Sequence, residues 1–257
     1  MRRLIALVLA CSALVAGTAA PAAAVTYGTP DTEHDYVGLL VFYDAEGTPL
    51  WRCSGTLISP TVVLTAGHCT FEADSAQFFL QDTMPSTYPY SGGITGTPYT
   101  YPLYDDAAFY TNDVGVVVLD KRVTLREVST YGELAPVGTV EELLDEPTQL
   151  LTIVGYGLQG VVKPVASAER TRYQGTVQLI EATSSLAGTY SFRYTANPGK
   201  AHTGGGCFGD SGGPIFIEGT NIILGVNSYV LNSNCKGTGG AFRVDQQAVQ
   251  DWINSFL

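Results

Sequence analysis

The sequence has few charged residues and few basic ones. Only 14% of its 257 residues are charged, and 13 Lys and Arg stand against 24 Asp and Glu, which gives a formal net charge of −11 at pH 7. This balance argues against proteins that bind nucleic acid or anionic lipid through basic charge, and it suits a soluble exported protein. The C-x2-C spacing typical of metal sites is absent, and neither a metal nor another cofactor is predicted. The sequence also shows no internal repeat and little helical periodicity.

Long apolar runs are also lacking after the first 24 residues. There, Arg2 and Arg3 precede the apolar stretch Leu4–Ala16, and the small residues Ala22–Ala24 follow. This pattern predicts a secretory signal peptide, residues 1–24, cleaved after Ala24. The mature chain would then begin at Val25, be extracellular and have no membrane segment. It would keep 11 basic and 24 acidic residues, a net charge of −13.

Cysteine is scarce, and its number is odd. Of five cysteines, Cys11 would leave with the signal peptide, and the remaining four allow three pairings: Cys53, Cys69, Cys207 and Cys235. Disulfides are the default for an exported chain. A rival interpretation makes Cys11 a lipid-attachment site, but it leaves the small-residue run through Ala24 unexplained.

Short runs of β-branched and aromatic residues between turn signals predict an all-β fold. The expected strands are Val37–Tyr43, Ser54–Ile58, Val62–Ala66, Gln77–Leu80, Val114–Leu119, Leu150–Tyr156, Tyr173–Ile180, Ser191–Tyr194, Pro214–Ile217, Ile222–Tyr229 and Gly240–Arg243. Apolar residues at helical spacing predict one helix, about Asp245–Phe256, with Asp245 as N-cap. Ser129–Pro147, with a brief helical turn over Val140–Leu144, is the candidate linker between two strand-rich halves.

The stretch Cys207–Pro214, with the sequence CFGDSGGP, concentrates the chemistry of the chain. Its glycines permit a tight turn that presents one hydroxyl, Ser211, while the N–H groups of Gly209 and Ser211 face a substrate carbonyl oxygen. A nucleophile beside two such donors is what acyl transfer requires. A lone G-x-S-x-G would be equally consistent with a glycine-rich hairpin loop, but the full string GDSGGP is far more specific.

Two further residues could complete such a site. His68 follows the apolar strand Val62–Ala66 and precedes Cys69, whereas His34 and His202 have the setting of surface residues. Asp113 stands at the head of an apolar run, where a carboxylate needs hydrogen bonds.

The strings TAGHC, NDVGVVVL and GDSGGP together resemble the motifs of the trypsin/chymotrypsin-like serine proteases. Their order His68, Asp113, Ser211 is that of chymotrypsin and not of subtilisin or the α/β-hydrolases. The resemblance runs from Val25 to the C-terminal helix, with poorly matching loops. It implies two six-stranded antiparallel β-barrels, residues 25–135 and 136–257 with the helix, and the disulfides Cys53–Cys69 and Cys207–Cys235.

The resemblance also implies roles for other residues. Ser228 would support Asp113, and the strand through Tyr229 and Val230 would pair with the substrate backbone. Gly205, Val230 and Gly240 occupy the positions that shape the pocket for the side chain preceding the cut. Without an acid at Gly205 and with a branched residue at Val230, small or medium apolar side chains are expected rather than Arg or Lys.

In this family a new N-terminal amine inserts beside the aspartate preceding the nucleophile, here Asp210. Val25-Thr26-Tyr27-Gly28 resembles the family's start with two departures, so signal cleavage itself is expected to create the activating amine. The pH profile should be bell-shaped, with His68 near an unperturbed pKa of about 6.5. Protein or peptide substrates and a monomeric state are expected.

Some interpretations stay open at this point. A protease-like binding protein with a dead site is disfavoured because Ser211, His68 and the oxyanion glycines are all retained, and an esterase on another fold is disfavoured by the motif order. A calcium loop at Glu72 and Asp74 has no fixed ligand set. The aromatic stretch Tyr88–Tyr110 either lines a subsite or packs a barrel edge.

Overall fold

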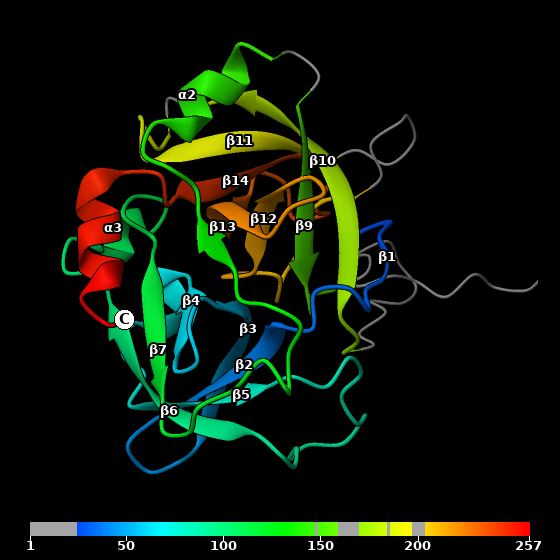
Figure 1. Ribbon diagram of the computed structural model, residues 1–257, viewed down its shortest axis with the longest axis vertical. Helices are drawn as coiled ribbons and strands as arrows, with labels where there is room; N and C mark the ends of the chain where they lie inside the picture. The colour runs from blue at the N-terminus through cyan, green and yellow to red at the C-terminus, as the bar shows by residue number, and fades with distance from the viewer. Residues whose placement is uncertain (1–24, 147–148, 159–169, 184–185, 197–203) are drawn as a thin grey trace, which may run out of the picture.

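The computed structural model describes residues 25–146, 149–158, 170–183, 186–196 and 204–257. The predicted signal peptide and His202 lie outside the described residues. The described chain forms two closed antiparallel β-barrels of six strands each, one below the other in Figure 1. This confirms the predicted fold class.

The first barrel has the strand order β2-β3-β4-β7-β6-β5. Its strands are β2 (Val37–Tyr43), β3 (Pro49–Leu57), β4 (Val62–Thr65), β5 (Ser75–Phe79), β6 (Ile94–Thr100) and β7 (Gly115–Leu119). Every residue of β2 is buried because its alternate side chains enter two apolar clusters on opposite faces. Leu40 and Phe42 join the barrel interior, and Leu39 and Val41 pack outside it against Tyr156.

The second barrel follows the order β10-β11-β14-β13-β12-β9 and is closed by pairing of β9 with β10. Its strands are β9 (Leu150–Gly155), β10 (Tyr173–Glu181), β11 (Ser191–Ala196), β12 (Pro214–Ile217), β13 (Ile222–Val230) and β14 (Gly237–Arg243). Two short strands from outside this span join its sheet: β1 (Thr29–Pro30) pairs with β10, and β8 (Glu133–Leu134) pairs with β13. The chain segments that precede and follow the first barrel in the sequence therefore both pair with strands of the second barrel.

Short helices complete the described fold: α1 (Gly67–Thr70), η1 (Asp106–Ala108), α2 (Thr139–Leu144) and α3 (Gln247–Asn254). α2 covers the predicted helical turn Val140–Leu144 and begins one residue earlier, and α3 lies within the predicted C-terminal helix. The ring of Trp252 lies 5.2 Å from that of Tyr101, so α3 packs against the first barrel, as Figure 1 shows.

The predicted N-cap of α3 was wrong. The cap position is Gln246, and no side chain caps the helix. Asp245 is buried, and its carboxylate accepts hydrogen bonds from Arg243 and from the N–H of Val140. The carboxylate is therefore engaged by the guanidinium of Arg243 and by the first turn of α2, and not by α3.

Every predicted strand is present, but β6 was missed. Its sequence, ITGTPYT, contains Gly96 and Pro98 and has only one fully buried residue. Glycine and proline are depleted in strands, and weak alternation hides the period of two. Pairing with β5 and β7 holds this segment in the barrel.

Arg172 joins the two barrels. Its side chain is fully buried; Nε donates to Asp31 Oδ2 at 2.9 Å, Nη2 to Asp82 Oδ1 at 2.5 Å and Nη1 to the carbonyl of Val37 at 3.1 Å. Asp31 is also buried, and its negative charge is stabilised there by His34 and by this guanidinium together.

His34 is half-buried, in contrast to the surface position expected for it. Its Nδ1 lies 2.9 Å from Asp31 Oδ1, and its ring stacks on Phe216 of β12 at 5.1 Å. Contacts across the barrel interface, which local sequence does not show, account for the difference.

Candidate active site

The loop 204–213, between β11 and β12, carries Ser211. Gly212 has a φ of +77°, and a Cβ there would lie 2.0 Å from Thr65 Oγ1 in the first barrel. Gly209 has a φ of +99° and sits against the backbone of Gly157. Only glycine combines these dihedrals with so close an approach. Within the described chain, the N–H groups of Gly209 and Ser211 donate to no protein acceptor.

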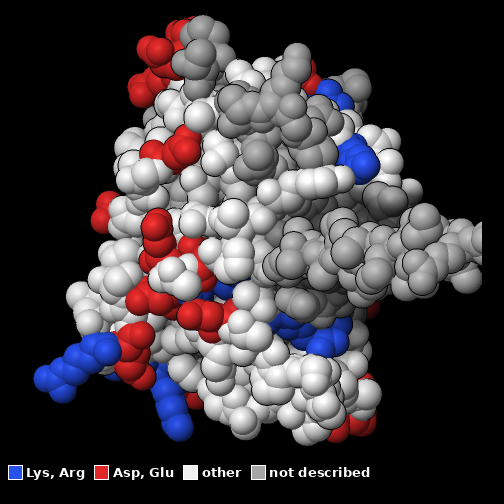
Figure 2. Space-filling view, turned by 90° about the vertical axis from the view of Figure 1, so that its right-hand side faces the viewer, with Lys and Arg blue, Asp and Glu red and all other residues white. Residues whose placement is uncertain are grey.

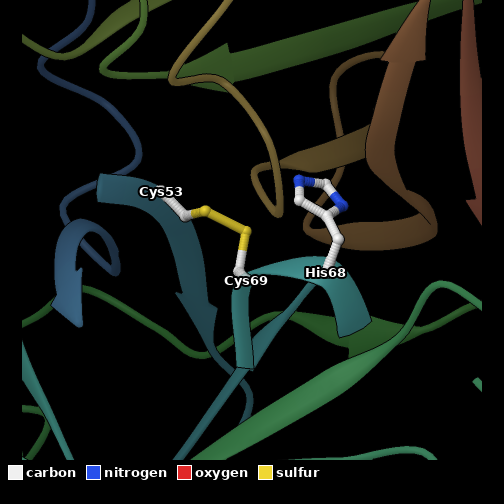
Figure 3. A group of neighbouring side chains, drawn as sticks. All are labelled: Cys53, His68 and Cys69. Carbon is white, nitrogen blue, oxygen red and sulfur yellow. A yellow bond between two sulfur atoms is a disulfide. The ribbon is translucent and has the colours of Figure 1, made fainter. Parts of the chain in front are cut away.

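His68 is positioned by α1, the short turn that follows β4. Its neighbour Cys69 forms a disulfide with Cys53 of β3, and Figure 3 shows the imidazole beside this disulfide. The second disulfide, Cys207–Cys235, ties the Ser211 loop to the segment before β14. Both disulfides that the resemblance implied are therefore present.

Asp113 lies behind His68 and is fully buried just before β7. Its Oδ1 accepts the backbone N–H of His68 at 2.8 Å. Its Oδ2 lies 2.8 Å from His68 Nδ1 and accepts the hydroxyl of Ser228 at 2.5 Å. A carboxylate can only accept, so the ring proton resides on Nδ1 and leaves Nε2 free to take a proton.

The pKa of His68 is shifted upward from its ordinary value of 6.5. Burial by itself lowers this pKa, but the charge of Asp113 and its hydrogen bond to Nδ1 raise it, with a further contribution from Asp106. The expectation of an unperturbed pKa was therefore wrong. The imidazolium is therefore favoured more at this position than it would be in water.

Ser211 and His68 line the same two hollows at the junction of the barrels. One, about 240 Å³, is bounded on its far side by Ser228, Tyr229 and Val230. The other, about 380 Å³, extends over the disulfide toward Trp51 and Arg52. No hydrogen bond between the two side chains is formed among the described contacts. Unbound active sites often have such loose geometry before substrate binds.

Ser54, a buried residue of β3, was missed by sequence reasoning. Its hydroxyl donates to the carbonyl of Gly209 at 3.0 Å and accepts the N–H of Tyr156 at 3.0 Å, and its own N–H donates to the carbonyl of Ser211 at 2.8 Å. One serine of the first barrel thus fixes the Ser211 loop of the second. The only sequence feature that could have indicated this role of Ser54 is its position next to Cys53.

Asp210 is fully buried directly before Ser211. It accepts the N–H groups of Cys207 at 2.9 Å and Gly157 at 2.8 Å. Burial raises its pKa to about 7 although these two hydrogen bonds lower it. No cation pairs with this carboxylate in the described chain. Val25 is fully buried in the core of the same barrel.

The family model described as Trypsin matches residues 27–253 of the chain. The chain belongs to the trypsin family. Relatives in this family include a chymotrypsin of Phaedon cochleariae, 26% identical over 86% of this chain and 78% of its own length. Trypsin 5G1 of Aedes aegypti is 30% identical over 78% of this chain and 73% of its own length.

A solved structure, HL collagenase, superposes with a TM-score of 0.70 over 90% of this chain and 97% of its own, at 22% identity. At that identity the likeness supports the fold, two barrels with a C-terminal helix. Through its family this trypsin-family chain is a hydrolase of the serine protease type.

The residues expected to shape the trypsin-family pocket divide into two groups. Ser228, Tyr229 and Val230 line the hollow of about 240 Å³ together with Phe109 and Phe208. Gly205 and Gly240 do not line it. Gly205 packs against Ala196, and Gly240 lies under the ring of Tyr229.

Deeper in the barrel, the hydroxyl of Tyr194 donates to the side chain of Asn227. Tyr194 is fully buried, and Gly206 and Gly239 pack closely against it. These buried contacts fill the barrel behind Asn227, which itself lines the hollow.

One group of side chains in the described region has the spacing of metal ligands: Cys53, His68 and Cys69 (Figure 3). The two sulfur atoms are bonded to each other, so neither is available as a thiolate. This group therefore gives no support to a metal site. No helix in the described chain is long and apolar enough to cross a membrane.

Proposed function

We propose that this trypsin-family chain is a secreted serine endopeptidase with the triad Ser211, His68 and Asp113. The observation that carries the proposal is the hydrogen-bonded series Ser228–Asp113–His68, which ends beside Ser211 in a shared hollow. Each member has the partner its role requires: a buried carboxylate behind Nδ1, and an Nε2 left free to face the nucleophile.

In the proposed reaction, Ser211 Oγ attacks the carbonyl carbon of the peptide bond while His68 Nε2 takes its proton. The N–H groups of Gly209 and Ser211 donate hydrogen bonds to the negative oxygen, and each such donor lowers the activation barrier by about 3–4 kcal/mol. The C–N bond then breaks as His68 returns the proton to the leaving amine. Water attacks the acyl-enzyme in the same manner and releases Ser211.

The pocket for the side chain preceding the cut would take small or medium apolar groups. Val230 borders the hollow, and its lining in the described chain contains no acidic residue that could pair with Arg or Lys. Tyr194 and Asn227 fill the space behind it.

Activation would follow from signal cleavage after Ala24. The new amine of Val25 would pair with Asp210, whose buried carboxylate otherwise has only backbone partners. Val25 is buried beside the Ser211 loop, and the N–H of Thr26 donates to the carbonyl of Gly205 at 3.0 Å. Monomeric action on proteins or peptides, without a cofactor, completes the proposal.

Labelling with a fluorophosphonate tests the proposal directly. The mature chain should react at Ser211, while Ser211→Ala should not react, and Ser255→Ala, which alters an exposed serine at the end of α3, should label normally. The mature chain should also cut peptides blocked at both ends, as an endopeptidase does. Absence of labelling in a folded mature chain would favour a binding protein, and ester cleavage without amide cleavage would favour an esterase.

A further inference from the structure

Arg52 borders the route by which the leaving half of a substrate would exit. It lines the hollow of about 380 Å³ that contains Ser211 and His68. It also lines the adjoining hollows of about 390 Å³, with Phe208 and Gly209, and of about 230 Å³, with Tyr88. All three hollows share Trp51 and Arg52 in their linings, and none is lined by Ser228, Tyr229 or Val230. They therefore form one groove, which we call the exit groove.

Arg170 lines the two outer hollows of the exit groove. Its guanidinium lies 5.7 Å from the centre of the Tyr90 ring, and Nη1 donates to the carbonyl of Ser86 at 3.2 Å. Its Nε is buried and has no hydrogen-bond partner. Arg52 reaches the same tyrosine, donating from Nη1 to its hydroxyl at 3.2 Å. The two cations therefore converge on one side chain.

Neither arginine pairs with a carboxylate in the described chain. Arg170 is half-buried and Arg52 is exposed. Every other buried or half-buried arginine of the described chain has an acidic partner: Arg172, Arg193 and Arg243. Figure 2 shows the general pattern on one face, where acidic groups cluster and basic groups occur at few separate places. Two unpaired cations in a groove leave donors available for an anion.

Charges change sign along the exit groove. In the inner hollow beside His68, the acids Glu72 and Asp106 outnumber the one arginine, Arg52, so a carboxylate on the first residue after the cut would meet a net negative charge. The linings of the two outer hollows contain both arginines and no acidic residue, together with the exposed apolar side chains Leu50 and Trp51. Trp51 is held by a hydrogen bond from Nε1 to the carbonyl of Cys69, at 2.8 Å.

We propose that Arg52 and Arg170 bind a carboxylate on the leaving half of the substrate, two or three residues after the cleaved bond. The carboxylate is an acidic side chain or the end of a peptide. This inference rests on the proposed endopeptidase function and adds a preference for acidic leaving segments. Two partly exposed pairs of this kind should change kcat/KM about three- to tenfold.

Matched quenched-fluorescence peptides test this preference. They share the acyl half, end in an amide and carry Glu, Gln or Lys at the second residue after the cut. Glu should exceed Gln about three- to tenfold in kcat/KM, and Lys should be poorest. Moving Glu to the first residue should abolish the advantage. The advantage should also shrink as salt is raised.

Variants assign the effect to the two arginines. Arg52→Gln and Arg170→Gln should each reduce the Glu-to-Gln ratio, and Arg52→Glu/Arg170→Glu should favour Lys. Arg126→Gln, which removes a charge from an exposed position outside the groove, should keep the wild-type ratio. Equal rates for Glu and Gln in the wild type would overturn the inference while leaving the endopeptidase proposal intact.

Two further measurements separate the remaining cases. Short peptides with a free or amidated end distinguish a terminal carboxylate from a side chain, and either preference supports the site. Binding of amidated leaving peptides to Ser211→Ala tests the site without turnover, so that failure of catalysis does not affect it. A Glu peptide that binds no tighter than its Gln counterpart would contradict the inference.

Discussion

Asp113→Asn is expected to abolish most activity without unfolding the protein. The backbone N–H of His68 donates to Oδ1 at 2.8 Å, and this donor fixes the orientation of an asparagine amide. The amide oxygen must face that N–H, because the opposite orientation would bring two donors together. The NH2 group then occupies the place of Oδ2, between His68 Nδ1 and the Ser228 hydroxyl.

An NH2 group at that place favours the opposite tautomer of the His68 imidazole. Nδ1 becomes the acceptor, the ring proton moves to Nε2, and Nε2 can no longer receive the proton of Ser211. We expect kcat to fall by about 10⁴-fold, which corresponds to about 5 kcal/mol of transition-state stabilisation. The side chain at position 113 would still contact the backbone N–H of His68, the Nδ1 of His68 and the Ser228 hydroxyl, although the donors in the last two contacts change. The midpoint of thermal unfolding should therefore change little.

The assay is hydrolysis of a blocked peptide amide by the mature chain, with circular dichroism and thermal unfolding as checks of the fold. Ser228→Ala is the matched comparison, because it removes one hydrogen bond from Asp113 Oδ2 and keeps the His68 tautomer. Its loss should be smaller, about tenfold. If the asparagine variant keeps more than about a tenth of wild-type kcat while folded, His68 is not oriented by Asp113 in the reaction.

The remaining predictions concern pH, the N-terminus and stability. Because the pKa of His68 is raised, the acid limb of kcat/KM should have its midpoint above pH 6.5, and a rate that has already reached its maximum at pH 5 would argue against this base. A residue retained before Val25 should cripple turnover by leaving Asp210 without its amine, and full activity of such a chain, verified by N-terminal sequencing, would exclude that activation. Arg172→Met should cost about 3–5 kcal/mol of unfolding free energy in urea because the buried Asp31 loses its guanidinium partner and keeps only His34 and backbone N–H groups, whereas a cost below about 1 kcal/mol would show that the ion pair contributes little.

The strands that sequence reasoning found share a strong local signal. Val37–Tyr43 and Pro214–Ile217 were predicted with the bounds observed, because dense β-branched and aromatic residues between turn signals encode them. β6 lacks that signal, and only its neighbours β5 and β7 define it. The helix at Gln247–Asn254 follows from its apolar spacing, but the environment of Asp245 depends on Arg243 and Val140.

The sequence by itself determined the fold class, the family and the candidate triad, because these are written in motifs of a few adjacent residues and in a period-two pattern of burial. The tertiary structure alone decided which distant side chains meet. Arg172 and Asp31 are 141 positions apart, and Ser54 and Gly209 are 155 apart. The unpaired arginines of the exit groove belong to the same class, since the partners of a charge depend on how two barrels dock, and no local window contains that information.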